Sequence, residues 1–186
     1  MANSILNIGG TGSGKTTFVK KSIIPNAKNI ILFDMYGDEY NDIQNIYTIF
    51  NINDFKGGKC RIVLDKNLYA NSQLLVDTFW SELTKLNNTT FVMEDATIFL
   101  DSRRDNDVKQ LLVEKRHSNM SYVWLFHSVS EIPPYIYKGS NAIRIGKTKD
   151  IDKDVINKFR GNEELIRAYM FVKNSKNKYE SKFLKL

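Results

Sequence analysis

The sequence has a single cysteine, Cys60, and no apolar run as long as a bilayer span requires. One cysteine excludes an internal disulfide and a zinc site built from several cysteines, and it fits a reducing compartment. We expect Cys60 to be a buried core thiol, because it lies near Ile62 and Leu64 in an apolar segment. The first eight residues lead directly into a glycine-rich stretch and not into a signal-peptide cleavage site. These absences predict a cytoplasmic protein without stable membrane insertion.

The chain has 186 residues, of which 42% are hydrophobic and 26% charged, as in soluble globular proteins. This length suits one domain, so we expect residues 1–186 to form a single unit. The net charge of +6 is concentrated near the C-terminus, where residues 138–186 contain 13 basic and 6 acidic residues. A one-sided basic surface suits the neutralisation of DNA phosphates, although a solvated lysine-rich surface is an equally good interpretation.

Short apolar segments alternate with stretches of helical periodicity, which is typical of a mainly parallel sheet covered by helices. The predicted strands are residues 4–8, 29–33, 60–64, 91–93, 122–126 and 141–145. The predicted helices are residues 14–24, 71–86, 106–117 and 150–159. Residues 167–172 and 179–184 are predicted to form a C-terminal β-hairpin. We therefore expect an α/β fold with three layers.

Residues 9–16 match the pattern G-x-x-x-x-G-K-[ST] between a predicted strand and a predicted helix. Glycines let the backbone curl round phosphate groups, and the helix directs its positive end at the anion. Lys15 would contact the β- and γ-phosphates, and the Thr16 hydroxyl would ligate Mg²⁺. The predicted ATP-binding residues are Gly10, Thr11, Gly12, Ser13, Gly14, Lys15, Thr16 and Thr17. The alternative, a glycine-rich turn that matches by chance, does not explain the flanking elements.

Two adjacent acids, Glu94 and Asp95, follow the short apolar strand at residues 91–93. The carboxyl ends of parallel strands meet at the edge of the sheet where nucleotides bind. One carboxylate can hold Mg²⁺ while the other polarises the water that attacks the γ-phosphate. By position we assign Glu94 to the metal and Asp95 to the water. An acidic turn after a core strand is the alternative.

Four stretches together resemble the FtsK/HerA superfamily of DNA-pumping ATPases, and within it the genome-packaging ATPases of membrane-containing, double-jelly-roll viruses. Beyond the phosphate loop, they are ILFDMYGDEY at residues 31–40, the acid pair at 94–95, KRHSNMSYVWLFHSVSEIP at 115–133 and NAIRI at 141–145. The resemblance covers about residues 4–150. It implies a P-loop NTPase fold of the additional-strand type. The family commonly has Asp before Glu at the acid pair, which is the reverse of the order here.

The resemblance also implies two further site residues. His127 stands where the family usually has a glutamine that senses the γ-phosphate, and a neutral imidazole can make the same hydrogen bonds. Arg116 is the first candidate for an arginine that reaches the γ-phosphate of a neighbouring subunit, followed by Arg103 and Arg104. The alternatives are a structural histidine and arginines that complement a helix dipole.

A member of this family would form a ring, most simply a hexamer, and would use ATP hydrolysis to move double-stranded DNA into a preformed capsid. The expected DNA contacts are to the backbone and independent of sequence. A capsid vertex or membrane protein is the further partner, and the host cytoplasm or the virion is the expected location. The alternatives are a plasmid or cellular translocase of this superfamily, a nucleotide-gated assembly factor, and a small-molecule kinase, for which the sequence lacks an arginine-rich lid.

Overall fold

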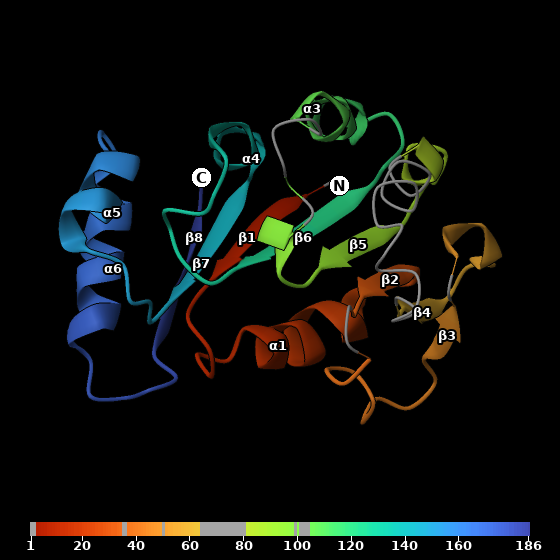
Figure 1. Ribbon diagram of the computed structural model, residues 1–186, viewed down its shortest axis with the longest axis horizontal. Helices are drawn as coiled ribbons and strands as arrows, with labels where there is room; N and C mark the ends of the chain where they lie inside the picture. Colours follow the sequence, from red (N-terminus) through yellow and green to blue (C-terminus); the bar gives the residue numbers. More distant parts are fainter. Residues whose placement is uncertain (1–2, 35–36, 50, 64–80, 99, 101–104) are drawn as a thin grey trace.

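The computed structural model describes residues 3–34, 37–49, 51–63, 81–98, 100 and 105–186. Within these ranges the chain forms one eight-stranded sheet in the order β3-β4-β2-β5-β6-β1-β7-β8 (Figure 1). All neighbouring strands are parallel except β7 and β8, which are antiparallel. The strands are β1 (Ser4–Ile8), β2 (Ile30–Phe33), β3 (Tyr47–Ile49), β4 (Lys59–Ile62), β5 (Thr90–Met93), β6 (Ser121–Phe126), β7 (Ala142–Gly146) and β8 (Ser181–Lys185).

Helices cover both faces of this sheet. In Figure 1, α1 lies below the sheet, α3 and α4 lie above it, and α5 and α6 stand beside β7 and β8. The longer helical elements are α1 (Lys15–Phe18), which continues as a π-helical turn (Val19–Ile23), α3 (Asp105–Glu114), α4 (Pro134–Gly139), α5 (Asp152–Lys158) and α6 (Glu163–Asn174). Short 3₁₀ turns lie at Ile24–Asn26, Ile52–Asp54 and Ala96–Ile98. The prediction of a three-layer α/β fold is confirmed.

The central strands carry two hydrophobic cores, one on each face, because successive side chains of a strand point in opposite directions. The core beneath the sheet, on the α1 face, contains Val19, Ile24, Ile30, Leu32, Val92, Val123 and Leu125. The core on the opposite face includes Phe33, Met93, Trp124, Phe126, Val108, Leu111 and Ile136. Strands buried on both faces are almost wholly apolar, as parallel strands usually are. They form a rigid base for the loops at their carboxyl ends.

The strand order separates the two predicted nucleotide-binding elements by one strand. The strand before the phosphate loop, β1, pairs with β6, and β6 pairs with β5, which leads into the acid pair. The same edge of the sheet therefore carries the phosphate loop, the residues after β6 and the acids after β5. This arrangement confirms the predicted additional-strand type of fold.

The predicted strand at residues 167–172 is wrong, because these residues lie within α6. Leu165, Tyr169 and Val172 are buried at helical spacing, and the Asn162 side chain caps the helix by accepting a hydrogen bond from Leu165 N. β8 does form a C-terminal β-hairpin, but its antiparallel partner is β7. The short elements β3 and α4 were not predicted, since three and six residues are too few for a clear period.

Other sequence-based expectations have mixed outcomes. Cys60 is fully buried on β4, as predicted, and burial raises the pKa of its thiol to about 12. The helix predicted at 71–86 lies mostly outside the described residues. In the ranges given above, no helix has both the length and the apolar character needed to cross a bilayer.

Candidate active site

The predicted phosphate loop connects β1 to α1, and its start is hydrogen-bonded to the last residue of β6 and to the residue after β7. Gly9 N donates a hydrogen bond to Phe126 O at 3.0 Å, and Gly10 N donates to Lys147 O at 2.7 Å. Gly12 and Gly14 have φ angles of 73° and 83°, in the left-handed region that favours glycine. The loop therefore curls back on itself at the carboxyl edge of the sheet.

The first turn of α1 offers N–H groups to an anion in this loop. Phe18 N donates to Gly14 O at 3.0 Å and so closes the first helical turn. Helix geometry leaves the N–H groups of Lys15, Thr16 and Thr17 without partners inside the helix. Thr16 is half-buried and Thr17 is exposed. Residues 10–17 therefore comprise a strand-to-helix loop and the first turn of a helix, the local structure that a phosphate-binding motif requires.

Lys15, His127 and Asp95 form a continuous hydrogen-bonded chain. The buried Lys15 amine donates to Gly9 O at 2.6 Å and lies 3.3 Å from His127 Nδ1. An ammonium group can only donate, so Nδ1 is the acceptor and Nε2 carries the imidazole proton. His127 Nε2 then donates to Asp95 Oδ1 at 2.5 Å. Three residues predicted from separate motifs therefore meet at one edge of the sheet.

Glu94 is the buried member of the acid pair, with 7% of its surface exposed. Burial raises the pKa of its carboxyl to about 7, and a hydrogen bond from the Tyr40 hydroxyl opposes this shift. Burial also lowers the pKa of Lys15, while the charges of Glu94 and Asp95 act in the opposite direction. The site is therefore an electrostatically coupled cluster of one lysine and two carboxyl groups.

Asp95 occupies a turn directly after β5, with φ at 47°. This left-handed conformation is uncommon for a residue with a side chain, although Asp tolerates it better than most. This conformation directs the carboxylate of Asp95 toward His127, while the carboxyl group of Glu94 accepts a hydrogen bond from the Tyr40 hydroxyl. The two acids therefore have different environments.

Sequence reasoning missed Tyr40 as a site residue. Its side chain is 1% exposed, and burial raises the pKa of its hydroxyl well above the ordinary value. It is the last residue of the stretch 31–40 on which the family resemblance partly rests. An aromatic residue at the end of that stretch was the available signal, but nothing local indicated its partner.

Sequence reasoning also missed Arg144, which is hydrogen-bonded to the phosphate loop and to β1. This buried residue of β7 donates through Nη1 to Asn7 Oδ1 at 2.9 Å and through Nη2 to Ser13 O at 3.1 Å. Asn7 Nδ2 in turn donates to Lys15 O at 3.1 Å. Burial lowers the pKa of Arg144. A single arginine in an otherwise apolar strand was the signal that could have identified it.

Arg116 lies away from this cluster. It is exposed in the turn between α3 and β6, at the amino end of β6, whereas the phosphate loop lies at the carboxyl edge. A six-residue strand such as β6 spans roughly 17 Å. Arg116 therefore does not join the site of its own chain. Arg103 and Arg104 lie outside the described residues.

The residues at the site fit the Mg²⁺ ion that the motif predicts. In the described part of the chain, no group of three or more His, Cys, Asp or Glu side chains could hold a metal. Mg²⁺ at phosphate sites needs fewer protein ligands, since phosphate oxygens and water complete its shell. The Thr16 hydroxyl and the Glu94 carboxylate are hard oxygen donors of the required kind. They remain the predicted metal ligands.

The glycine-rich loop lies between a strand and a helix, and the acids follow a second strand that one further strand separates from the first. This arrangement defines a P-loop NTPase of the additional-strand type. Such proteins bind nucleotides through this loop. More narrowly, the chain belongs to the family described as helicase HerA, central domain, whose model matches residues 3–185.

Solved structures with the same fold include viral packaging proteins. The genome packaging NTPase B204 from Sulfolobus turreted icosahedral virus 2, in complex with AMPPCP, matches with a TM-score of 0.77 and 17% identity, over 99% of this chain and 92% of that chain. The same protein in complex with AMP matches with a TM-score of 0.75 and 18% identity, over 99% of this chain and 92% of that chain. B204 from Sulfolobus turreted icosahedral virus, a DNA-packaging ATPase, matches with a TM-score of 0.72 and 18% identity, over 98% of this chain and 92% of that chain. No curated protein matches the sequence.

Proposed function

We propose that this protein is an ATPase that translocates double-stranded DNA and packages a viral genome into a preformed capsid. The observation that carries the proposal is the joining of Lys15, His127 and Asp95 beside a phosphate loop, in a chain of the HerA central-domain family. The B204 structures support the packaging role, because this chain and those proteins share one fold over nearly their whole lengths.

The described side chains suit hydrolysis of a γ-phosphate. A bound Mg-ATP supplies the scissile phosphate and its charge-neutralising metal. Lys15 has a buried ammonium group to place at the β- and γ-phosphates, and the half-buried Thr16 supplies a hydroxyl for the metal. Asp95 is the acceptor that orients the attacking water, and the Nε2–H of His127, which donates to Asp95 here, is the group that would turn to the terminal phosphate. Glu94 remains the metal ligand in this scheme.

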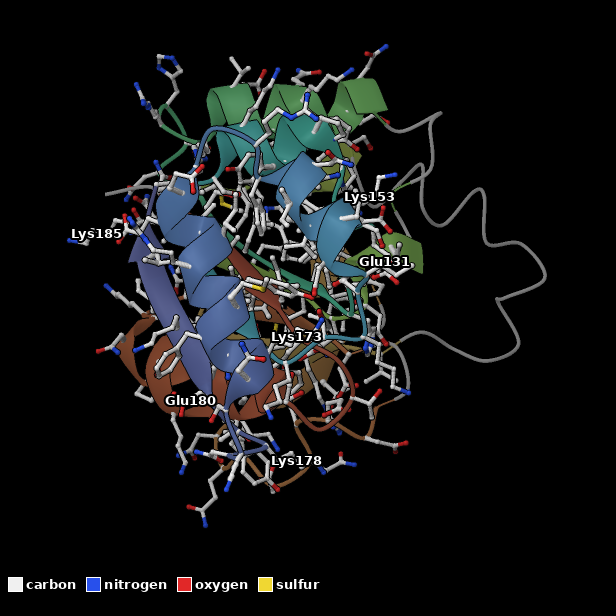
Figure 2. All side chains as sticks on the ribbon, turned by 90° about the vertical axis from the view of Figure 1, so that its left-hand side faces the viewer. Glu131, Lys153, Lys173, Lys178, Glu180 and Lys185 are labelled. Carbon is white, nitrogen blue, oxygen red and sulfur yellow. The ribbon has the colours of Figure 1, made fainter. Side chains whose placement is uncertain are left out.

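Lysines on the surface formed by α6, β8 and the loop between them are candidates for DNA contact. Lys185 projects from this surface, while Lys173 pairs with Asp152 (Figure 2). Among the described residues, Lys176, Lys182 and Lys185 have no carboxylate partner in an ion pair. Unpaired lysines can bind the phosphates of any sequence and release counterions. A packaging motor requires contact of this kind, because it must move every part of a genome.

Assembly into a ring completes the proposal. Arg116 is exposed at the amino end of β6 and can stabilise transition-state charge only at the site of another copy. We propose a hexamer with a capsid vertex or membrane protein as its docking partner, in the host cytoplasm or on the virion.

The decisive experiment measures phosphate release from ATP with and without double-stranded DNA, together with the native mass. We expect turnover that rises with DNA of any sequence, falls with added salt and accompanies a ring-sized mass. Lys15→Ala is the inactive control. Turnover that ignores DNA in a monomer would favour a kinase, and slow DNA-independent hydrolysis in an oligomer would favour an assembly factor. DNA stimulation in the absence of any capsid association in infected cells would favour a cellular or plasmid translocase.

A further inference from the structure

The two sides of the phosphate loop have different chemistry. β1 lies between β6 and β7, and the acids and His127 all lie on the β6 side. The β7 side carries β8 and the segment of residues 175–180 that joins α6 to β8. A nucleotide whose terminal phosphate faces the acids must direct its sugar and base to the other side. The base therefore meets whatever residues the β7 side presents.

Lys147 links the segment 175–180 to the phosphate loop through hydrogen bonds. The Lys147 amine donates a hydrogen bond to Ser175 O, and the carbonyl of the same Lys147 accepts from Gly10 N at 2.7 Å. Within the segment, Asn177 N donates to Ser175 Oγ at 3.1 Å, and Tyr179 N donates to Asn177 Oδ1 at 3.0 Å. These hydrogen bonds give the segment a defined shape next to the loop.

Two side chains of this segment reach the loop itself. The Cε and Nζ atoms of Lys178 each lie 3.2 Å from where a Cβ on Gly12 would stand. Tyr179 Cδ1 lies 4.0 Å from the corresponding position on Gly14. Lys178 Nζ is 5.8 Å from the centre of the Tyr179 ring, and Figure 2 shows Lys178 beyond the end of α6. A cation and an aromatic ring therefore border the phosphate loop on the side away from the acids.

Tyr179 is 64% exposed. An open aromatic face is suited to stacking with a nucleobase, and a neighbouring ammonium group is suited to phosphate. We propose that Tyr179 stacks with the base of the bound nucleotide and that Lys178 adds positive charge beside its phosphate chain. This inference rests on the proposed ATPase function and adds the residues that hold the nucleoside half.

The test compares ATP with inorganic tripolyphosphate, which has the same phosphates and no base. Calorimetric titration of the full chain should show that Tyr179→Ala weakens ATP about tenfold and leaves tripolyphosphate unchanged, since one stacked base is lost. Tyr179→Phe keeps the ring and should bind both ligands as the wild type does. Lys178→Gln should weaken both ligands several-fold. Phe171→Ala removes another exposed ring with a lysine over it, and Lys185→Gln another exposed lysine, so both are matched controls.

The outcomes separate this inference from the function on which it rests. If the wild-type chain binds neither ATP nor tripolyphosphate, the ATPase proposal fails. If the wild type binds ATP and Tyr179→Ala binds it equally well, the stacking role is wrong. Equal weakening of ATP and tripolyphosphate by Tyr179→Ala would mean that the ring only supports the loop, which also overturns the inference. Unchanged binding in Lys178→Gln would remove Lys178 from the site.

Discussion

Replacing Glu94 with Gln should stabilise the nucleotide-free, metal-free protein at pH 8. The pKa of Glu94 is raised from 4.5 to about 7 by burial, so the folded protein binds this proton more tightly than the unfolded chain does. Stability therefore falls as the pH rises from about 4.5 through 7. Above pH 7, the ionised carboxyl opposes folding by about 3 kcal/mol, because each tenfold difference in proton affinity between the two states corresponds to roughly 1.4 kcal/mol. Gln has nearly the same shape and carries no such cost.

Thermal unfolding with a metal chelator at pH 5 and pH 8 measures this effect. For a chain of this size, about 3 kcal/mol corresponds to a rise in Tm of roughly 6–12 °C for Glu94→Gln at pH 8. The difference should shrink at pH 5, where the wild-type carboxyl is protonated. Glu164→Gln, at an exposed position on α6, is the control and should change Tm little at either pH. A wild type as stable as Glu94→Gln at pH 8 would refute the reasoning. Glu94→Gln should nevertheless hydrolyse ATP poorly, because an amide is a weak Mg²⁺ ligand.

The other predictions concern binding and turnover. Lys15→Ala should abolish ATP binding in calorimetric titration, and wild-type affinity would remove the phosphate loop from the mechanism. Asp95→Asn should keep ATP affinity while kcat falls about a hundredfold or more, as expected for loss of a group that orients water; an unchanged kcat would shift that role to Glu94. Arg116→Ala should leave ATP affinity and Tm unchanged but abolish turnover, which addition of subunits that carry Lys15→Ala and an intact Arg116 should partly restore. Arg144→Met removes the donors to Ser13 O in the phosphate loop and to Asn7 Oδ1 on β1, and should weaken ATP binding about tenfold, whereas Arg144→Lys should lose less.

Local signals were sufficient for the parts of the site that lie within one motif. The phosphate loop and the acid pair were predicted because each follows an apolar strand and contains chemistry readable from adjacent residues. The strand order that brings them together was expected from the resemblance and not from periodicity. The meeting of Lys15, His127 and Asp95 follows from that order, since β6 separates β1 from β5.

The remaining site contacts join residues that are far apart in the chain. Asn7 and Arg144 are separated by 137 positions, and Tyr40 and Glu94 by 54. No short pattern indicates such pairs. The error at residues 167–172 has a different cause, because a short window there fits either a strand or a helix. The buried positions 165, 169 and 172 identify the helix only when the window extends back to its Asn162 cap.

The hydrogen bonds of the phosphate loop have a consequence for ligand binding. Phe126 and Lys147 accept hydrogen bonds from the start of the loop, and Arg144 donates to Ser13 O and to Asn7. All of these partners belong to the protein, so we expect the loop to keep its shape without a nucleotide. The site is then preorganised, and a phosphate chain binds without the cost of ordering the backbone around it.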